Sequence, residues 1–120
     1  MNFFRKAIAA LIPLNILLFV HTAIAQTYYR AGDFTITLTE NNPKTGRTYR
    51  GCDSLRNCIV LYYGTSWRNG NRRGITWENG SYFYVVSWQD DDRASPMYLT
   101  VFQGEKQLLR KPLQPLRSSE

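Results

Sequence analysis

The chain has 120 residues, and 15 Lys and Arg residues against 9 Asp and Glu residues give a formal net charge of +6 at neutral pH. This length is typical of one small domain. The single histidine, His21, lies in a segment that we expect to be removed. The rest of the chain therefore lacks the residues for a His-assisted Ser or Cys nucleophile, a zinc site of the usual His and Cys type, or a haem with a His ligand.

The first 25 residues have the pattern of a cleavable secretory signal. Arg5 and Lys6 form a basic start, residues 7–20 are apolar, and Ala23-Ile24-Ala25 supplies the small residues of a signal peptidase site. The apolar stretch is short and contains a proline, so it is poorly suited to spanning a membrane. We therefore predict a secreted or periplasmic protein with no stable membrane anchor after cleavage.

The chain that remains after cleavage has the pattern of a β protein. Apolar residues alternate with threonine from Phe34 to Thr39, which is typical of a strand with one buried face. The Asn, Pro and Gly residues of 41–46 predict a turn, and a short strand follows at 48–51. We predict that residues 26–111 form a single all-β domain and that residues 112–120 form a flexible tail.

Two cysteines, Cys52 and Cys58, are expected to pair in an exported protein. A straight strand would separate their Cα atoms by roughly 20 Å, whereas a disulfide tolerates at most about 7 Å. The chain must therefore fold back between them, which makes them the tip of a hairpin with arms at 48–51 and 59–63. Closing this small loop contributes about 2 to 3 kcal/mol in the chain-entropy model.

The strongest hairpin signal is Asn79-Gly80, which suits a two-residue type I′ turn between strands at 74–78 and 81–88. In this register Glu78 lies opposite Ser81, and one face of the hairpin carries the large side chains. We expect this face to form the core, and the alternative is an exposed stacking platform for sugars or bases. Its members are Ile75, Trp77, Tyr82, Tyr84, Val86 and Trp88.

A last hairpin is predicted at Gly104-Glu105, where Gly suits the first central position of a type II′ turn between 97–103 and 106–111. Pro112 and Pro115 are expected to end the pairing. About seven short strands then fit an antiparallel meander that forms a small barrel or a two-layer sandwich, stapled by one disulfide. Closure into a barrel is the favoured arrangement because it hides strand edges.

Charge is unevenly distributed, with a net +6 over residues 41–73 and a net −4 over residues 74–105. The segment 67–74 combines a tryptophan, three arginines and two glycines, and we predict a ligand-binding loop there. The alternative is a solvated surface without a ligand. The candidate ligand-binding residues are Trp67, Arg68, Arg72 and Arg73, together with Arg56 in the disulfide loop.

The acidic residues do not mark a catalytic or metal site. Asp90-Asp91-Asp92 could face a hard cation, but it lacks the spacing of a calcium loop. The other carboxylates considered, Asp33, Asp53 and Glu78, show no spacing that selects a glycosidase pair. We therefore predict no enzyme activity, no cofactor and no metal.

These observations favour a small exported, non-enzymatic binding module for an anionic cell-wall or extracellular polysaccharide. The alternative is a protein-interaction module, such as an inhibitor of an exported hydrolase, that presents Arg56 on the loop between Cys52 and Cys58. Export and the modest charge of +4 that remains after cleavage, from 13 basic and 9 acidic residues, argue against nucleic acid.

Overall fold

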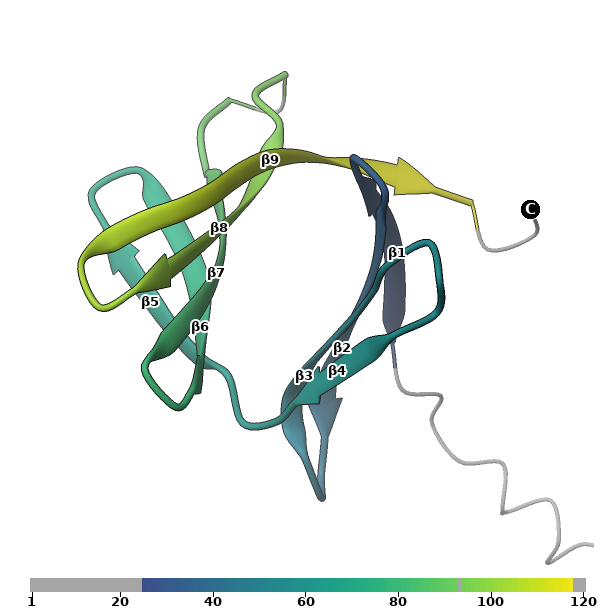
Figure 1. Ribbon diagram of the computed structural model, residues 1–120. Helices are drawn as coiled ribbons and strands as arrows, with labels where there is room; N and C mark the ends of the chain where they lie inside the picture. Colours follow the sequence, from purple (N-terminus) through teal and green to yellow (C-terminus); the bar gives the residue numbers. More distant parts are fainter. Residues whose placement is uncertain (1–24, 93, 118–120) are drawn as a thin grey trace, which may run out of the picture.

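One antiparallel sheet curls into a half-barrel in the computed structural model, which describes residues 25–92 and 94–117 (Figure 1). The predicted signal segment, except Ala25, lies outside the described residues, as does the end of the predicted tail. No helix occurs in the described ranges. The strands are β1 (Gln26–Ala31), β2 (Phe34–Asn42), β3 (Gly46–Cys52), β4 (Cys58–Leu61), β5 (Thr65–Asn69), β6 (Arg72–Asn79), β7 (Tyr82–Gln89), β8 (Met97–Gln103) and β9 (Lys106–Leu116).

The strand order is β4-β3-β2-β1-β9-β8-β7-β6-β5. Strands that follow one another along the chain pair within each half of the sheet, and β9 also pairs with β1 and so joins the two halves, as Figure 1 shows. The end strands β4 and β5 do not pair with each other. The predicted all-β antiparallel fold is confirmed, but the architecture is a half-barrel of nine described strands, not a barrel or sandwich of about seven.

Sequence reasoning missed β1 and β5. Strand β1 has few large apolar residues, and it is held by pairing with β2 on one side and β9 on the other. Strand β5 lies in the segment predicted to be a loop. Gly70, with a φ of 63°, begins a two-residue turn that pairs Asn69 with Arg72. The segment 67–74, predicted to be a loop, is therefore a hairpin. Its arginines and polar residues alternate between the two faces of the paired strands.

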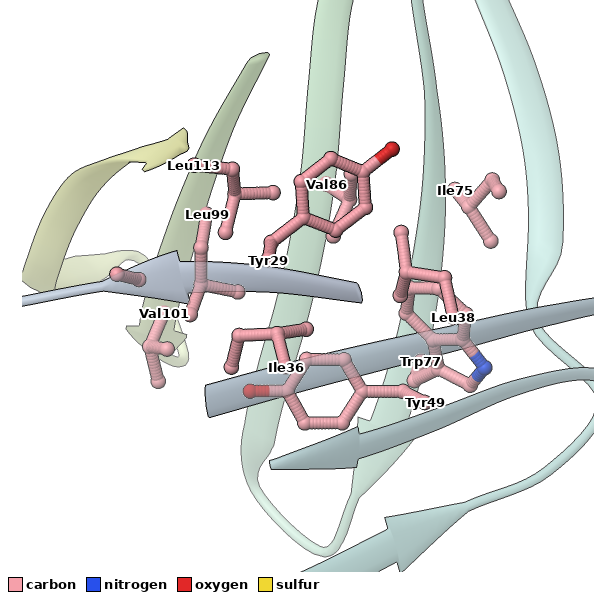
Figure 2. Packing of buried hydrophobic residues seen from close by; sticks show 11 residues of the cluster. Tyr29, Ile36, Leu38, Tyr49, Ile75, Trp77, Val86, Leu99, Val101 and Leu113 are labelled. Carbon is pink, nitrogen blue, oxygen red and sulfur yellow. The ribbon is translucent and has the colours of Figure 1, made fainter. Parts of the chain in front are cut away.

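The core lies on the concave side of the half-barrel, where side chains from both halves meet (Figure 2). Trp77 is its largest fully buried side chain, with 1% of its surface exposed, and its indole N–H donates to the Arg47 carbonyl at 2.9 Å. The Tyr49 ring packs against it, with ring centroids 5.5 Å apart. The predicted inward face is confirmed for Ile75, Trp77 and Val86, whereas Tyr82 at the end of the hairpin is exposed.

The turn between β6 and β7 differs from the prediction. The turn residues are Gly80 and Ser81, so Asn79 pairs with Tyr82 and Trp77 with Tyr84. Gly80 has a φ of 66° and Ser81 has a negative φ, which excludes type I′ and fits a turn with glycine at its first central position. Because the partner of each residue moves by two positions, every side chain keeps its predicted face.

The disulfide and the last hairpin form as predicted, whereas the last strand is longer than predicted. The Cys52–Cys58 disulfide forms, and the Gly104-Glu105 turn pairs Gln103 with Lys106. However, β9 does not end at Pro112, since it continues through both prolines to Leu116. Both prolines lie where β9 changes partner, since Pro112 is opposite Tyr98 of β8 and Pro115 is opposite Tyr29 of β1.

A short linker, residues 62–64, connects the two end strands across the open side of the half-barrel. Tyr63 and Gly64 donate backbone hydrogen bonds at 2.9 Å to the carbonyls of Thr45 and Arg47. A Cβ on Gly64 would lie 2.6 Å from Ile75 and Trp77, so glycine lets the linker lie directly on the core. The linker thus ties the beginning of β3 to β6 and positions the site described next.

Candidate functional site

A polar hollow of about 460 Å³ opens at the end of the half-barrel where β3 begins and β7 ends. We call it the arginine pocket, because arginines from three strands line it. Its lining residues are Glu40, Arg47, Ser66, Trp67, Arg68, Arg73, Gly74, Ile75 and Trp88. The curl of the sheet brings these residues together from β2, β3, β5, β6 and β7.

Arg68 and Arg73 lie directly opposite each other on β5 and β6. Like charges in this arrangement destabilise a strand pair, and Asp90 after β7 offsets the repulsion. Its carboxylate lies 2.9 Å from the Arg68 guanidinium and 3.5 Å from that of Arg73. The Asp90 amide also donates to the Asn71 carbonyl at 2.8 Å, which holds this carboxylate beside both arginines.

Arg47 enters the arginine pocket from the other half of the sheet. The register shifts between Thr39 and Asn42, so that two residues of β2 lie opposite Arg47 on β3. Such a bulge changes the direction of nearby side chains, and here Glu40 and Arg47 both line the hollow. The Arg47 carbonyl accepts hydrogen bonds from Gly64 and from the Trp77 indole, so the backbone that carries this guanidinium is held firmly.

The charges of the arginine pocket do not cancel. Three guanidinium groups, those of Arg47, Arg68 and Arg73, face the carboxylates of Glu40 and Asp90, which leaves one positive charge. Within the described residues, the Arg47 guanidinium makes no hydrogen bond or ion pair. Arginine presents N–H donors in a planar fork that matches a carboxylate. The arrangement can therefore hold one monovalent anion.

Trp88 gives the arginine pocket a flat apolar wall, and its side chain is half-buried. The indoles of Trp67 and Trp77 donate to Thr76 and to the Arg47 carbonyl, respectively. The Trp88 indole has no such partner in the part of the chain that the structure describes. A neighbouring hollow of about 370 Å³ shares Trp88 and continues toward Asp92, so the wall extends beyond the arginines.

The structure divides the candidate residues predicted from the sequence into three places. Arg68 and Arg73 lie together in the arginine pocket. Trp67 packs on the convex face across Gly74 and reaches the pocket rim only at the sheet edge, while Arg72 donates to Ser87 at 2.8 Å on that convex face. Arg56 lies in the disulfide loop beyond the other end of β3.

Five residues of the arginine pocket lie outside the predicted segment 67–74 and were not among the candidate ligand-binding residues: Glu40, Arg47, Ser66, Ile75 and Trp88. Side chains alternate along β3, so Arg47 lies on the same concave side as the buried Tyr49. The sequence pattern therefore indicated the face of this arginine. Trp88 was predicted to face inward as part of the core, and the alternative was that its face forms a stacking platform for sugars or bases. For Glu40 the pattern of β2 indicates its face, but nothing in the sequence places it beside Arg47.

The aspartates of the loop after β7 have protein partners. Asp90 pairs with the two arginines, Asp91 accepts from the Asn71 side chain at 2.9 Å, and Asp92 accepts from the Ala94 amide at 3.0 Å. Within residues 25–92 and 94–117, no three His, Cys, Asp or Glu side chains group as a metal site would require. Their geometry therefore matches a role in holding the loop.

The disulfide loop is organised by Asp53, whose carboxylate accepts hydrogen bonds from the amides of Leu55 and Asn57 at 2.9 Å and 2.8 Å. The bonds from Asn57 lower the pKa of this carboxyl below its ordinary value. Arg56 has a φ of 68°, and Leu55 at the tip is 80% exposed. The loop is thus a rigid projection with an apolar tip.

Comparisons with protein families, with curated proteins and with solved structures find no match for this chain. Among the described residues there is no helix of the length and apolar character needed to cross a membrane. A disulfide in a small β domain is compatible with an extracellular location.

Proposed function

We propose that this protein is an exported, non-enzymatic binding module that holds an acidic sugar of an extracellular polysaccharide in the arginine pocket. The observation that carries the proposal is the meeting of Arg47, Arg68 and Arg73, from three different strands, beside the Trp88 indole. A sugar ring has apolar faces that stack on an indole, and a uronic acid adds one carboxylate for an arginine.

The size and charge of the arginine pocket favour this ligand over more highly charged ones. Its volume of about 460 Å³ falls in the range of ligand sites, and its one uncompensated positive charge matches one carboxylate per sugar. A nucleic acid needs an extended basic surface, whereas Arg72 and Arg56 lie away from this pocket. The acidic polysaccharide therefore remains the leading ligand class, at a site made from Arg68 and Arg73 with the addition of Arg47.

The test compares polygalacturonate with the same polymer after methyl esterification, which keeps the sugar ring and removes its charge. We expect the purified, oxidised protein to bind polygalacturonate at least tenfold more tightly, because a hydrogen bond to a charged group contributes about 1.5 to 3 kcal/mol. Binding should weaken as salt rises. Equal binding of the two polymers would contradict the proposal.

Neighbouring arginines provide matched variants. Arg47→Gln and Arg73→Gln remove one charge inside the arginine pocket and should each weaken binding about tenfold or more. Arg72→Gln and Arg56→Gln remove the same charge on the convex face and in the disulfide loop, and should change binding less than threefold. If all four variants weaken binding equally, the protein attracts polyanions only through its total charge.

A second candidate function is protein interaction through the disulfide loop. The exposed Leu55 at its tip and the hydrogen bonds to Asp53 favour a preorganised projection. Inhibition of a panel of exported hydrolases by the oxidised protein should disappear on reduction, or with Leu55→Ser or Arg56→Ala. If reduction leaves inhibition unchanged, the loop is not the inhibitory element.

A further inference from the structure

A second cavity, of about 370 Å³, lies at the opposite end of the half-barrel from the arginine pocket. We call it the tyrosine cavity, because Tyr49 and Tyr84 contribute rings to it. Aliphatic side chains from both halves of the sheet complete most of its wall, including Ile59, Leu99 and Val101. The volume and the mainly apolar lining are those of a small-molecule site.

Tyr49 gives the tyrosine cavity a polar group that has no protein partner. The side chain is only 3% exposed, and its hydroxyl lies against Gly51, which also lines the cavity. No described residue forms a hydrogen bond with this hydroxyl. Figure 2 shows the Tyr49 ring beneath Ile36, and its hydroxyl lies along its own strand, toward Gly51. Among the described residues no fully buried side-chain nitrogen or oxygen lacks a hydrogen-bond partner, so this hydroxyl is open to the cavity, where a ligand acceptor can receive its hydrogen bond.

The rim of the tyrosine cavity determines which charge a ligand can carry. Asp53 and Asn57 line the rim, and the Asp53 carboxylate is held by the disulfide loop. The lowered pKa of Asp53 keeps this group negative at neutral pH, so an anionic ligand would be repelled. Burial raises the pKa of Tyr49, so its hydroxyl stays protonated and can donate.

We propose that the tyrosine cavity binds a small, neutral, largely apolar molecule with one hydrogen-bond acceptor, which receives the Tyr49 hydroxyl. The disulfide and the hydrogen bonds to Asp53 keep the rim in place before the ligand arrives, which reduces the entropy lost on binding. This site shares no lining residue with the arginine pocket, so its ligand does not depend on the proposed carbohydrate function.

Three probes of nearly the same shape test the proposal. Ethylbenzene has no acceptor, acetophenone adds one carbonyl oxygen, and benzoate carries a charge. We expect acetophenone to bind about tenfold more tightly than ethylbenzene, and benzoate to bind most weakly. Binding is measured by NMR titration of the full oxidised domain, with shift changes at the methyl groups of Ile59, Leu99 and Val101.

The variant Tyr49→Phe removes the hydroxyl and keeps the ring. It should reduce acetophenone affinity about tenfold, to that of ethylbenzene, and leave ethylbenzene affinity unchanged. Tyr29→Phe makes the same change at a buried tyrosine that does not line the cavity, and acetophenone should still bind more tightly there. The proposal is overturned if no probe shifts the three methyl groups, or if the parent protein binds acetophenone and ethylbenzene equally.

Discussion

The two ends of the half-barrel are built from the same strands but offer opposite chemistry. Strand β3 contributes Arg47 to the arginine pocket and Gly51 to the tyrosine cavity, and β7 contributes Trp88 to the first and Tyr84 to the second. All four residues lie on the concave side. The difference arises because several strands carry a charged inward side chain near one end of the half-barrel and apolar inward side chains near the other end. A single core therefore supports two distinct sites.

The largest expected effect is from Trp77→Ala, which removes the side chain that lies between the two ends. Large aromatic-to-alanine changes in a core cost about 3 to 5 kcal/mol, and Trp77 also donates to the Arg47 carbonyl. Urea unfolding should show this loss of stability, and the variant should bind both polygalacturonate and acetophenone less tightly. Trp67→Ala on the convex face should cost less, because that ring is only half-buried. Equal losses of stability in the two variants would contradict the central packing role of Trp77.

Replacing Cys52 and Cys58 by serine should weaken binding at the tyrosine cavity and leave binding at the arginine pocket unchanged. The disulfide stabilises by about 2 to 3 kcal/mol in the chain-entropy model, and its loop forms part of the rim of the tyrosine cavity. Calorimetry should show the lower stability, and the folded variant should bind acetophenone less tightly while it keeps its affinity for polygalacturonate. Loss of polygalacturonate binding in the folded variant would contradict the independence of the two sites.

High pH should lower the free energy of unfolding because of the raised pKa of Tyr49. Burial raises its pKa above the ordinary value of 10.0, so above pH 10 the unfolded chain releases this proton while the folded chain keeps it. The free energy of unfolding then falls by about 1.4 kcal/mol per pH unit for this residue. Below pH 10 the contribution is fully present. Urea unfolding between about pH 9 and about pH 11 should be less pH-dependent in Tyr49→Phe, but not in Tyr63→Phe, where the ring is exposed.

The smallest expected effect on stability is from Asp90→Asn. Its ion pairs with Arg68 and Arg73 involve side chains that are about one third to one half exposed, and such pairs contribute about 1 kcal/mol or less. Removing the carboxylate raises the charge of the arginine pocket, so polygalacturonate should bind several-fold more tightly by calorimetric titration. Glu105→Gln, in the turn between β8 and β9, makes the same charge change without this gain. Weaker binding in Asp90→Asn would show that Asp90 positions the arginines.

Much of the fold was predictable from local patterns. The Gly104-Glu105 turn, the Cys52–Cys58 pair and the inward face of Trp77 follow from turn chemistry, chain geometry and alternation. The shifted turn at Gly80 shows the limit of this reasoning, because neighbouring turn registers satisfy the same short signal. Strand β1 was missed because its stability comes from strands that pair with it on both sides.

The candidate site was predictable only in part. Arg68 and Arg73 were selected from composition, but the sequence could not separate them from Arg72, because a predicted loop has no defined faces and a hairpin does. Arg47 lies more than 20 positions away from these arginines, so its proximity depends on the curl of the whole sheet.

The sequence by itself determined the alternation of buried and exposed side chains, the positions of most turns and the pairing of the cysteines, because each depends on residues close along the chain. The tertiary structure alone decided that the sheet stays open as a half-barrel and that β9 joins its two halves. It also decided which charged side chains share one end. Those features depend on packing between distant strands, where small differences in twist and register accumulate across the sheet.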